Sequence, residues 1–171
     1  MSLEPRTILV AACGNPWAAD DSFGPCVARC LNQFQLAGVE VVDLAMRPAG
    51  LLDLLPGRQA LAVVDAAQCS AESLGRMLEF DWFDPRRPEL LHDDALSSHG
   101  LSLNVQLELA QKLGVLPGQV RLFAVGIAGA DPAGEMDMRI QRCVKPTARR
   151  VAHWCRGIAP ARHEQGEPRH A

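Results

Sequence analysis

The chain has 171 residues, 48% of them hydrophobic and 22% charged, an ordinary globular composition that suggests one domain with a substantial core. Its net charge of −3 lacks the basic footprint of a nucleic-acid-binding domain. No apolar run approaches the roughly 20 residues that span a bilayer, so we predict no transmembrane helix.

The N-terminus and the cysteines indicate a cytoplasmic protein. Residues 1–7 carry Glu4 and Arg6 and lack the architecture of a signal peptide. The six cysteines contain no CxxC pair, which is typical of reduced, mostly buried thiols rather than of a disulfide framework. Cys26 and Cys30 lie one helical turn apart and could share a metal, but two thiols fall short of the four ligands of a structural zinc site.

In the first half of the chain, short apolar runs alternate with segments of helical period. Strands are predicted at Ile8–Cys13, Val39–Leu44 and Gln59–Ala66. Helices are predicted at Ser22–Gln35, whose apolar residues fall on one face, and at the short segment Ala49–Leu55.

The second half continues the alternation. Strands are predicted at Arg76–Phe80 and Val120–Val125. A helix is predicted at Gly100–Leu113, with Ser97 or Ser98 as its cap. The last helix is predicted at Asp137–Cys155, where Pro146 should kink or interrupt it.

This order of elements predicts the fold class. Strands that are apolar along their whole length and alternate with helices favour a parallel sheet covered on both faces. We therefore predict an α/β fold, a three-layer α/β/α sandwich with a mostly parallel five-stranded sheet. It should form a single domain over residues 1–157, followed by a flexible tail at 158–171 that is rich in Pro, Gly and charge.

Candidate site residues follow three of the predicted strands. Asp20 and Asp21 come shortly after the first strand, Asp65 closes the third, and His99 opens the helix after the fourth. In open α/β sheets, sites form outside the carboxyl ends of the strands, so these side chains should meet at one edge. Two carboxylates and an imidazole can hold a divalent transition metal with open positions, and imidazole suits nickel, zinc, copper and iron alike.

Each of these residues also has a structural interpretation. Asp20 or Asp21 could cap the helix that begins at Ser22, where a cap contributes about 0.5–2 kcal/mol, and we expect Asp20 to take that role and leave Asp21 as the ligand. Asp65 is harder to explain structurally, because a carboxylate closing an apolar strand is costly to desolvate without a partner. His99, taken alone, is more typical of a surface or capping histidine.

The turn Gly14-Asn15-Pro16 also allows a nucleotide-binding interpretation, since a glycine turn between strand and helix can cradle phosphate. The dinucleotide fingerprint, however, needs three glycines at fixed spacing. Here Asp20 and Asp21 stand where a phosphate would be repelled. No Ser or Cys occupies a G-x-S-x-G elbow. A nucleotide or small-molecule α/β hydrolase remains the less favoured alternative.

The ordered set of motifs resembles the hydrogenase maturation protease family. The similarity runs from Thr7 to Cys155, and Val120–Ile127 looks like the late strand of that family. The motifs, in chain order, are Gly14-Asn15-Pro16, Asp20-Asp21-Ser22-Phe23-Gly24, Val63-Val64-Asp65-Ala66 and Ser98-His99-Gly100-Leu101.

Matched motif by motif, the resemblance implies that Asp21, Asp65 and His99 contact the metal and that Asp21 and Asp65 take part in catalysis. The family often has Glu at the position of Asp21, which carries the same charge on a shorter side chain. Such proteins detect nickel in a hydrogenase large-subunit precursor and cut off its C-terminal extension. A metal-bridged Asp21 or Asp65 could orient the attacking water, or the nickel could act as Lewis acid.

The resemblance therefore implies a nickel-dependent endopeptidase whose substrate is a nickel-loaded [NiFe]-hydrogenase large-subunit precursor. The nickel belongs to the substrate, and no permanently bound cofactor is expected. We expect a cytoplasmic monomer that has the precursor as its partner and binds neither nucleic acid nor membrane.

The sequence departs from the family pattern after the second strand. The family tends to have an acid followed by a glycine-rich threonine turn, whereas this chain has Asp43 followed by residues 44–50, Leu-Ala-Met-Arg-Pro-Ala-Gly. This segment is expected to border the substrate groove, so the departure bears on which hydrogenase is recognised and on whether cleavage occurs. The main alternative is a non-cleaving, metal-sensing chaperone of the same fold.

Overall fold

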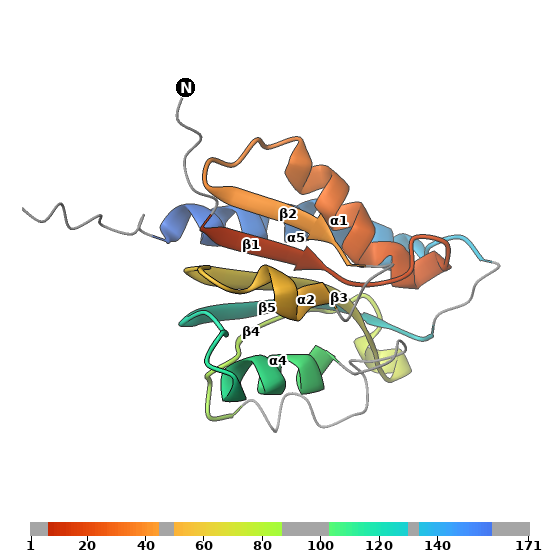
Figure 1. The fold of residues 1–171 in the computed structure, drawn as a ribbon. Coiled ribbons are helices and arrows are strands. Elements are labelled where there is room, and N and C mark those ends of the chain that lie inside the picture. The colour runs from red at the N-terminus through yellow and green to blue at the C-terminus, as the bar shows by residue number, and fades with distance from the viewer. Residues whose placement is uncertain (1–6, 45–49, 87–102, 130–133, 159–171) are drawn as a thin grey trace, which may run out of the picture.

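The computed structural model describes residues 7–44, 50–86, 103–129 and 134–158. Figure 1 shows how helices and strands alternate along this part of the chain. In chain order the elements are β1 (Ile8–Ala12), the 3-10 helix η1 (Ala19–Ser22), α1 (Phe23–Asn32), β2 (Val39–Asp43), α2 (Leu51–Leu54), β3 (Ala60–Gln68), the 3-10 helix η3 (Ala71–Ser73), β4 (Met77–Asp81), α4 (Leu103–Lys112), β5 (Gln119–Ile127) and α5 (Met138–Gly157).

The strands form one sheet in the order β2-β1-β3-β5-β4. All neighbouring pairs are parallel except β4 and β5, which are antiparallel. The mostly parallel five-stranded sheet predicted from the sequence is thus confirmed. From β1 the chain moves outward to β2 and then returns to β3 on the other side of β1. The topological switch point, where α/β proteins place their sites, therefore lies between β1 and β3.

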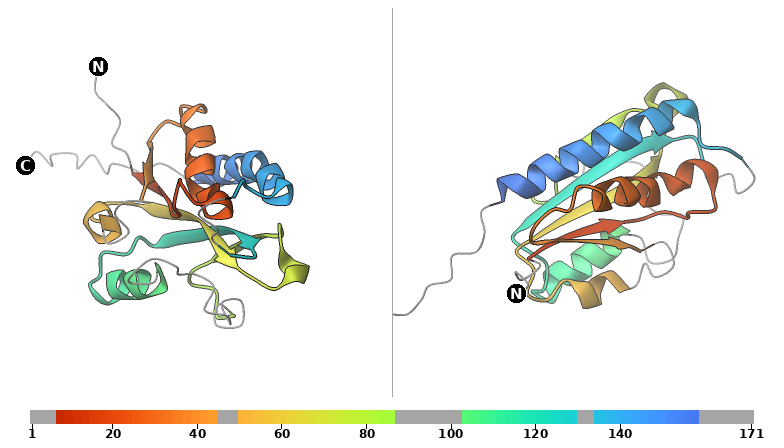
Figure 2. Two further views of the ribbon diagram at one scale, coloured as in Figure 1. Left: turned by 90° about the vertical axis from the view of Figure 1, so that its right-hand side faces the viewer. Right: turned by 90° about the horizontal axis from the view of Figure 1, so that it is seen from above.

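Helices cover both faces of the sheet, as Figures 1 and 2 show. α1 and α5 pack on one face, and α2 and α4 pack on the other. Each face has its own buried core, so the predicted three-layer sandwich is confirmed. None of the helices in the described ranges is both long enough and apolar enough to cross a membrane.

Alternation along the central strands explains why the sequence reads as unbroken apolar runs. Val10 and Ala62 belong to the core under α1 and α5, whereas Leu9 and Leu61 belong to the core under α2 and α4. Successive side chains of a strand point to opposite faces, so a strand covered on both sides needs apolar residues throughout. The same alternation directs Asp65 toward the α2 and α4 side of the sheet.

The structure changes two expectations about element boundaries. The prediction had Asp65 close the third strand, but β3 continues to Gln68. β5 extends beside it and pairs with it as far as Ile127. α5 runs from Met138 to Gly157 without interruption at Pro146. Pro146 is exposed, so the hydrogen bond that its missing N–H cannot make is lost on the solvent side, where water can satisfy the carbonyl. The predicted cap residues Ser97 and Ser98 lie outside the described residues.

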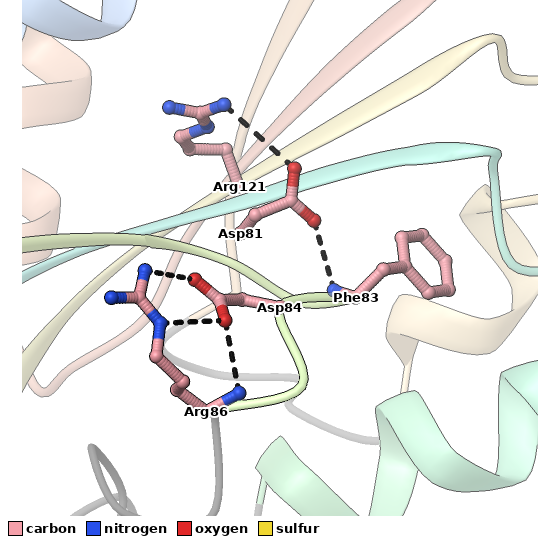
Figure 3. Close-up of polar contacts among 5 residues, drawn as sticks. All are labelled: Asp81, Phe83, Asp84, Arg86 and Arg121. Carbon is pink, nitrogen blue, oxygen red and sulfur yellow. Dashed lines mark hydrogen bonds and ion pairs between the residues drawn. The ribbon is translucent and has the colours of Figure 1, made fainter.

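Charged side chains line the antiparallel edge of the sheet. Arg121 of β5 lies 3.7 Å from the carboxylate of Asp81 of β4, which also accepts a hydrogen bond from the N–H of Phe83 (Figure 3). In the turn that follows, the Asp84 carboxylate accepts hydrogen bonds from the backbone and guanidinium of Arg86. Charges on an edge strand oppose pairing with another chain.

Candidate active site

Two glycines allow the segment after β1 to lie directly on the carboxyl edge of the sheet. Gly14 has φ +120°, and a Cβ placed there would lie 2.1 Å from the Asp21 carbonyl oxygen. A Cβ on Gly24 would lie 1.9 Å from the carbonyl oxygen of Cys13 and 3.0 Å from that of Val64. Because only glycine fits such close approaches, these two positions fix η1 and the start of α1 against β1 and β3.

Asp21 is buried at this edge, with 3% of its surface exposed. Its Oδ2 accepts a hydrogen bond of 2.8 Å from the backbone N–H of Asn15, so the carboxylate is anchored to the turn that follows β1. The same bond disfavours the nucleotide interpretation, because a backbone donor that could face a phosphate is already bound to a carboxylate. The Asn15 side chain in turn accepts the N–H of Trp17 at 3.0 Å.

Asp20 has a different role from the one predicted. Its Oδ1 accepts a hydrogen bond of 2.7 Å from the N–H of Asp137, the residue that caps α5. The N-cap residues of η1 and α1 are Ala18 and Ser22, and neither forms a side-chain cap. The expectation that Asp20 caps the helix beginning near Ser22 is therefore wrong. Asp20 instead joins η1 to the start of α5.

Asp65 lies in the middle of β3 and has intermediate solvent exposure. The pKa of its carboxyl is raised to about 7, mainly by burial in the sheet and in smaller part by the negative charge of Asp21. The N–H of Ala66, which donates to Asp65 Oδ1 at 2.8 Å, acts in the opposite direction and lowers the pKa. Since Coulomb interactions weaken with distance, this coupling indicates that Asp21 and Asp65 lie near one another at the switch point.

Two further residues lie beside this pair. The pKa of the Cys13 thiol is raised well above its ordinary value by burial and then by the charges of Asp65, Asp43 and Asp21. Asp43 ends β2 and is in register with Ala12 of β1, which brings it to the same edge. The sequence pattern placed Asp43 only at the border of the groove and counted Cys13 among the buried thiols. Their positions at the ends of adjacent strands are the signal that could have grouped them.

The third predicted metal-contacting residue, His99, lies outside the described residues. Within the described ranges, no group of three or more His, Cys, Asp and Glu side chains is arranged to hold a metal ion. The structure thus brings Asp21 and Asp65 together. Two carboxylates at the switch point suit a divalent cation that brings further ligands of its own, or a water molecule that needs orienting.

The chain resembles known proteins in its three-dimensional structure. No model of a known protein family and no curated protein matches the sequence. Several solved structures match most of the chain. The hydrogenase maturating endopeptidase HybD from E. coli is 24% identical, with a TM-score of 0.73 over 87% of this chain and 91% of that one.

Two further solved structures share this fold. A hydrogenase 2 maturation peptidase from a Thaumarchaeota archaeon is 25% identical, with a TM-score of 0.62 over 86% of this chain and 96% of that one. The [NiFe] hydrogenase maturation protease HycI from Thermococcus kodakarensis is 20% identical, with a TM-score of 0.68 over 90% and 94% of the two chains.

The sheet order, the two helical layers and the acidic site formed by Asp21 and Asp65 define an α/β/α protein with a candidate site at its topological switch point. Within that class, the chain has the fold of the hydrogenase maturation proteases. The resemblance indicated by the sequence motifs is thereby confirmed in three dimensions over most of the chain.

Proposed function

We propose that this protein is an endopeptidase that removes the C-terminal extension of a nickel-loaded [NiFe]-hydrogenase large-subunit precursor. The observation that carries the proposal is the pairing of Asp21 and Asp65 at the switch point, in a chain with the fold of hydrogenase maturation proteases. The nickel belongs to the substrate and reaches the acidic site with it.

The negative charges of the acidic site support the binding of a cation. Asp21 and Asp65 repel one another, and Asp43 adds a third carboxylate to the surroundings of Cys13. A divalent cation between the carboxylates would convert this repulsion into attraction, and oxygen donors are acceptable ligands for such an ion. Under this proposal, His99 supplies the third contact from the protein.

Each carboxylate is held in place by the backbone. Asp21 is anchored by the Asn15 N–H and Asp65 by the Ala66 N–H, so neither has to be ordered when the substrate arrives. Fixed carboxylates can orient a water molecule toward the scissile carbonyl, while the substrate's nickel can polarise that carbonyl as a Lewis acid. Both routes need the two acids on the same side of the peptide.

Recognition through the metal also explains how loaded and empty precursors would be distinguished. Selectivity is the difference between two binding free energies, and the bonds between the nickel and the acidic site exist only for the loaded precursor. An empty precursor forms none of these bonds, so the site favours the loaded form.

The test is a cleavage assay with purified protein and purified precursor, read by the mass of the precursor. The wild-type protein should shorten the nickel-loaded precursor and leave the nickel-free precursor intact, whereas Asp65→Ala and His99→Ala should cut neither. Asp53→Ala, which removes an exposed carboxylate on α2, is the matched control and should cut normally.

Two outcomes would overturn the proposal in different ways. Binding of the loaded precursor without any change in its mass would point to the non-cleaving chaperone. Equal cutting with and without nickel would show that the protein is a peptidase that does not read the metal. Circular dichroism of each variant establishes that the loss of activity is not a loss of fold.

A further inference from the structure

Helix α5 concentrates the positive charge of the chain. Its 20 residues include six Arg and Lys and contain no Asp or Glu. The whole chain has a net charge of −3, so subtracting these six positive charges leaves −9 on the remaining residues. The positive charge of α5 is therefore opposite in sign to the net charge of the rest of the protein.

Four of these cations form a single line on the outer side of α5. All four are exposed, while Ile140, Val151 and the other buried residues of the helix face the sheet. At 3.6 residues per turn, the four fall within an arc of about 60° and extend over about 21 Å of the helix axis. We call this line the basic stripe; it consists of Arg142, Lys145, Arg149 and Arg156.

The basic stripe is not used for ion pairing within the described part of the chain. Arg139 pairs with Asp137 and Arg150 pairs with Glu79, but none of the four stripe residues forms an ion pair with a described residue. Like charges three and four residues apart, such as Lys145 and Arg149, disfavour a helix. The stripe therefore opposes the stability of α5, which suggests that it serves contact with another molecule.

A hollow of about 570 Å³ adjoins the C-terminal half of the stripe. Arg149, Arg150 and His153 of α5 line one side of it, and Arg121 and Glu79 of the sheet line the other. The Nε atom of Arg121 is buried there without a hydrogen-bond partner among the described residues, although its guanidinium reaches the carboxylates of β4, as Figure 3 shows for Asp81. Because Arg121 and Arg150 already pair with Glu79, Arg149 is the guanidinium of the hollow that can receive a further carboxylate.

We propose that the basic stripe and the adjoining hollow bind an acidic polypeptide segment of the protein on which this chain acts. Charge complementarity supports a peptide segment, because a segment with carboxylates spaced along about 20 Å matches the stripe. The hydrogen bond from the N–H of Asp137 to Asp20 ties the beginning of α5 to the candidate site, so a protein held at the site can extend along the helix. The identity of the partner, but not its acidic chemistry, rests on the proposed function.

Other anionic partners fit the molecule less well. Membrane-surface helices insert an apolar face into the lipid, but the apolar face of α5 is buried against the sheet. A nucleic acid presents charge along its whole length and would meet the −9 on the rest of the chain. A peptide can place its acids on the stripe alone.

The chemistry is tested with a labelled peptide of ten glutamates by fluorescence anisotropy. The variant Arg142→Glu/Arg149→Glu should weaken binding at least about tenfold, and 0.5 M NaCl should weaken binding to the wild-type protein. The control variant Arg86→Glu/Lys112→Glu makes the same change in net charge away from α5 and should bind within about twofold of wild type. Equal loss in both variants, or no loss in either, would overturn the proposal.

Anionic vesicles of phosphatidylserine and a 20-base-pair DNA serve as competitors. Tighter binding of either one than of the peptide would also overturn the proposal. With a nickel-loaded precursor, the stripe variant should raise KM at least about fivefold and leave kcat within about twofold. If the wild-type protein cuts no precursor, the proposed function fails, whereas the peptide assay still tests whether the basic stripe binds an acidic segment.

Discussion

The carboxylate of Asp20 accepts a hydrogen bond from the backbone N–H of Asp137, 117 residues later in the chain, at a distance of 2.7 Å. This contact joins η1, which carries Asp21, to the start of α5. Asp20 thus fixes the position of α5 relative to the acidic site, and its loss should affect both stability and activity.

We predict that Asp20→Ala lowers the free energy of unfolding by about 1–2 kcal/mol, because the Asp137 N–H loses a partly buried charged acceptor. Asp20→Asn keeps an oxygen acceptor and should lose less. Urea unfolding followed by circular dichroism measures both. A change of less than about 0.5 kcal/mol in Asp20→Ala, the size usual for a surface substitution, would show that the contact does not stabilise α5.

The close approach of α1 to the sheet edge gives a second prediction. Gly24→Ala should lower the free energy of unfolding by about 1–3 kcal/mol or more, because its Cβ would overlap the Cys13 carbonyl oxygen, and backbone atoms cannot move aside cheaply. Gly118→Ala is the matched control, since a Cβ there meets no atom within 4 Å. Thermal unfolding of the two variants compares them directly, and similar melting temperatures would contradict the packing described for Gly24.

The sequence predicted the layers of this fold because each layer has a local signature. Strands such as Ile8–Ala12 and Ala60–Gln68 are apolar on both faces, and this pattern is typical of a parallel sheet buried between helices. The expectation that Asp21 and Asp65 approach one another came from the rule that strand ends gather at one edge, although β3 continues beyond Asp65 to Gln68. Neither inference needed long-range contacts.

The partners of the site residues could not be predicted in the same way. Asp20 looked like a cap for the adjacent helix, but its partner is Asp137, a contact that only the packed structure creates. Cys13 and Asp43 lie beside the acidic site because β1 and β2 are neighbours in register, which a single sequence does not state. The end of β3 at Gln68 depends on pairing with β5 in the same way.

The raised pKa of Asp65 predicts how stability depends on pH. The pKa is about 7 in the folded protein and near its ordinary value of 3.8 in the unfolded chain, so the folded state holds the proton more tightly. The contribution of Asp65 to stability is therefore fully present below about pH 4 and is lost as the pH rises to about 7. At about 1.4 kcal/mol per pKa unit, the loss is at most about 4 kcal/mol, and contact with solvent reduces it.

Asp65→Asn isolates this effect from the other titrating groups, because the amide stays neutral at every pH. Relative to wild type, the variant should gain stability steadily between pH 4.5 and pH 7.5. Urea unfolding of both proteins, without precursor or metal, gives the difference at each pH. Parallel stability curves would mean that Asp65 is charged and well solvated in the folded protein.

Trp17 provides a prediction about substrate contact. Its side chain is 80% exposed, yet its backbone is fixed by the Asn15 side chain, which accepts the Trp17 N–H in the same turn that anchors Asp21. A large aromatic side chain exposed on an ordered turn beside a candidate site is typical of residues that dominate binding. Under the proposed function, Trp17 should contact the precursor next to its nickel.

Trp17→Ala should therefore raise KM for the nickel-loaded precursor by about tenfold, equivalent to about 1.4 kcal/mol, with kcat changed much less. Its free energy of unfolding should stay within about 0.5 kcal/mol of wild type, because an exposed side chain leaves no cavity. Phe83→Ala is the control, since Phe83 is 46% exposed in the turn after β4, the antiparallel strand that runs away from the carboxyl edge. Equal KM values for the two variants would show that the precursor binds at the acidic site without contacting Trp17.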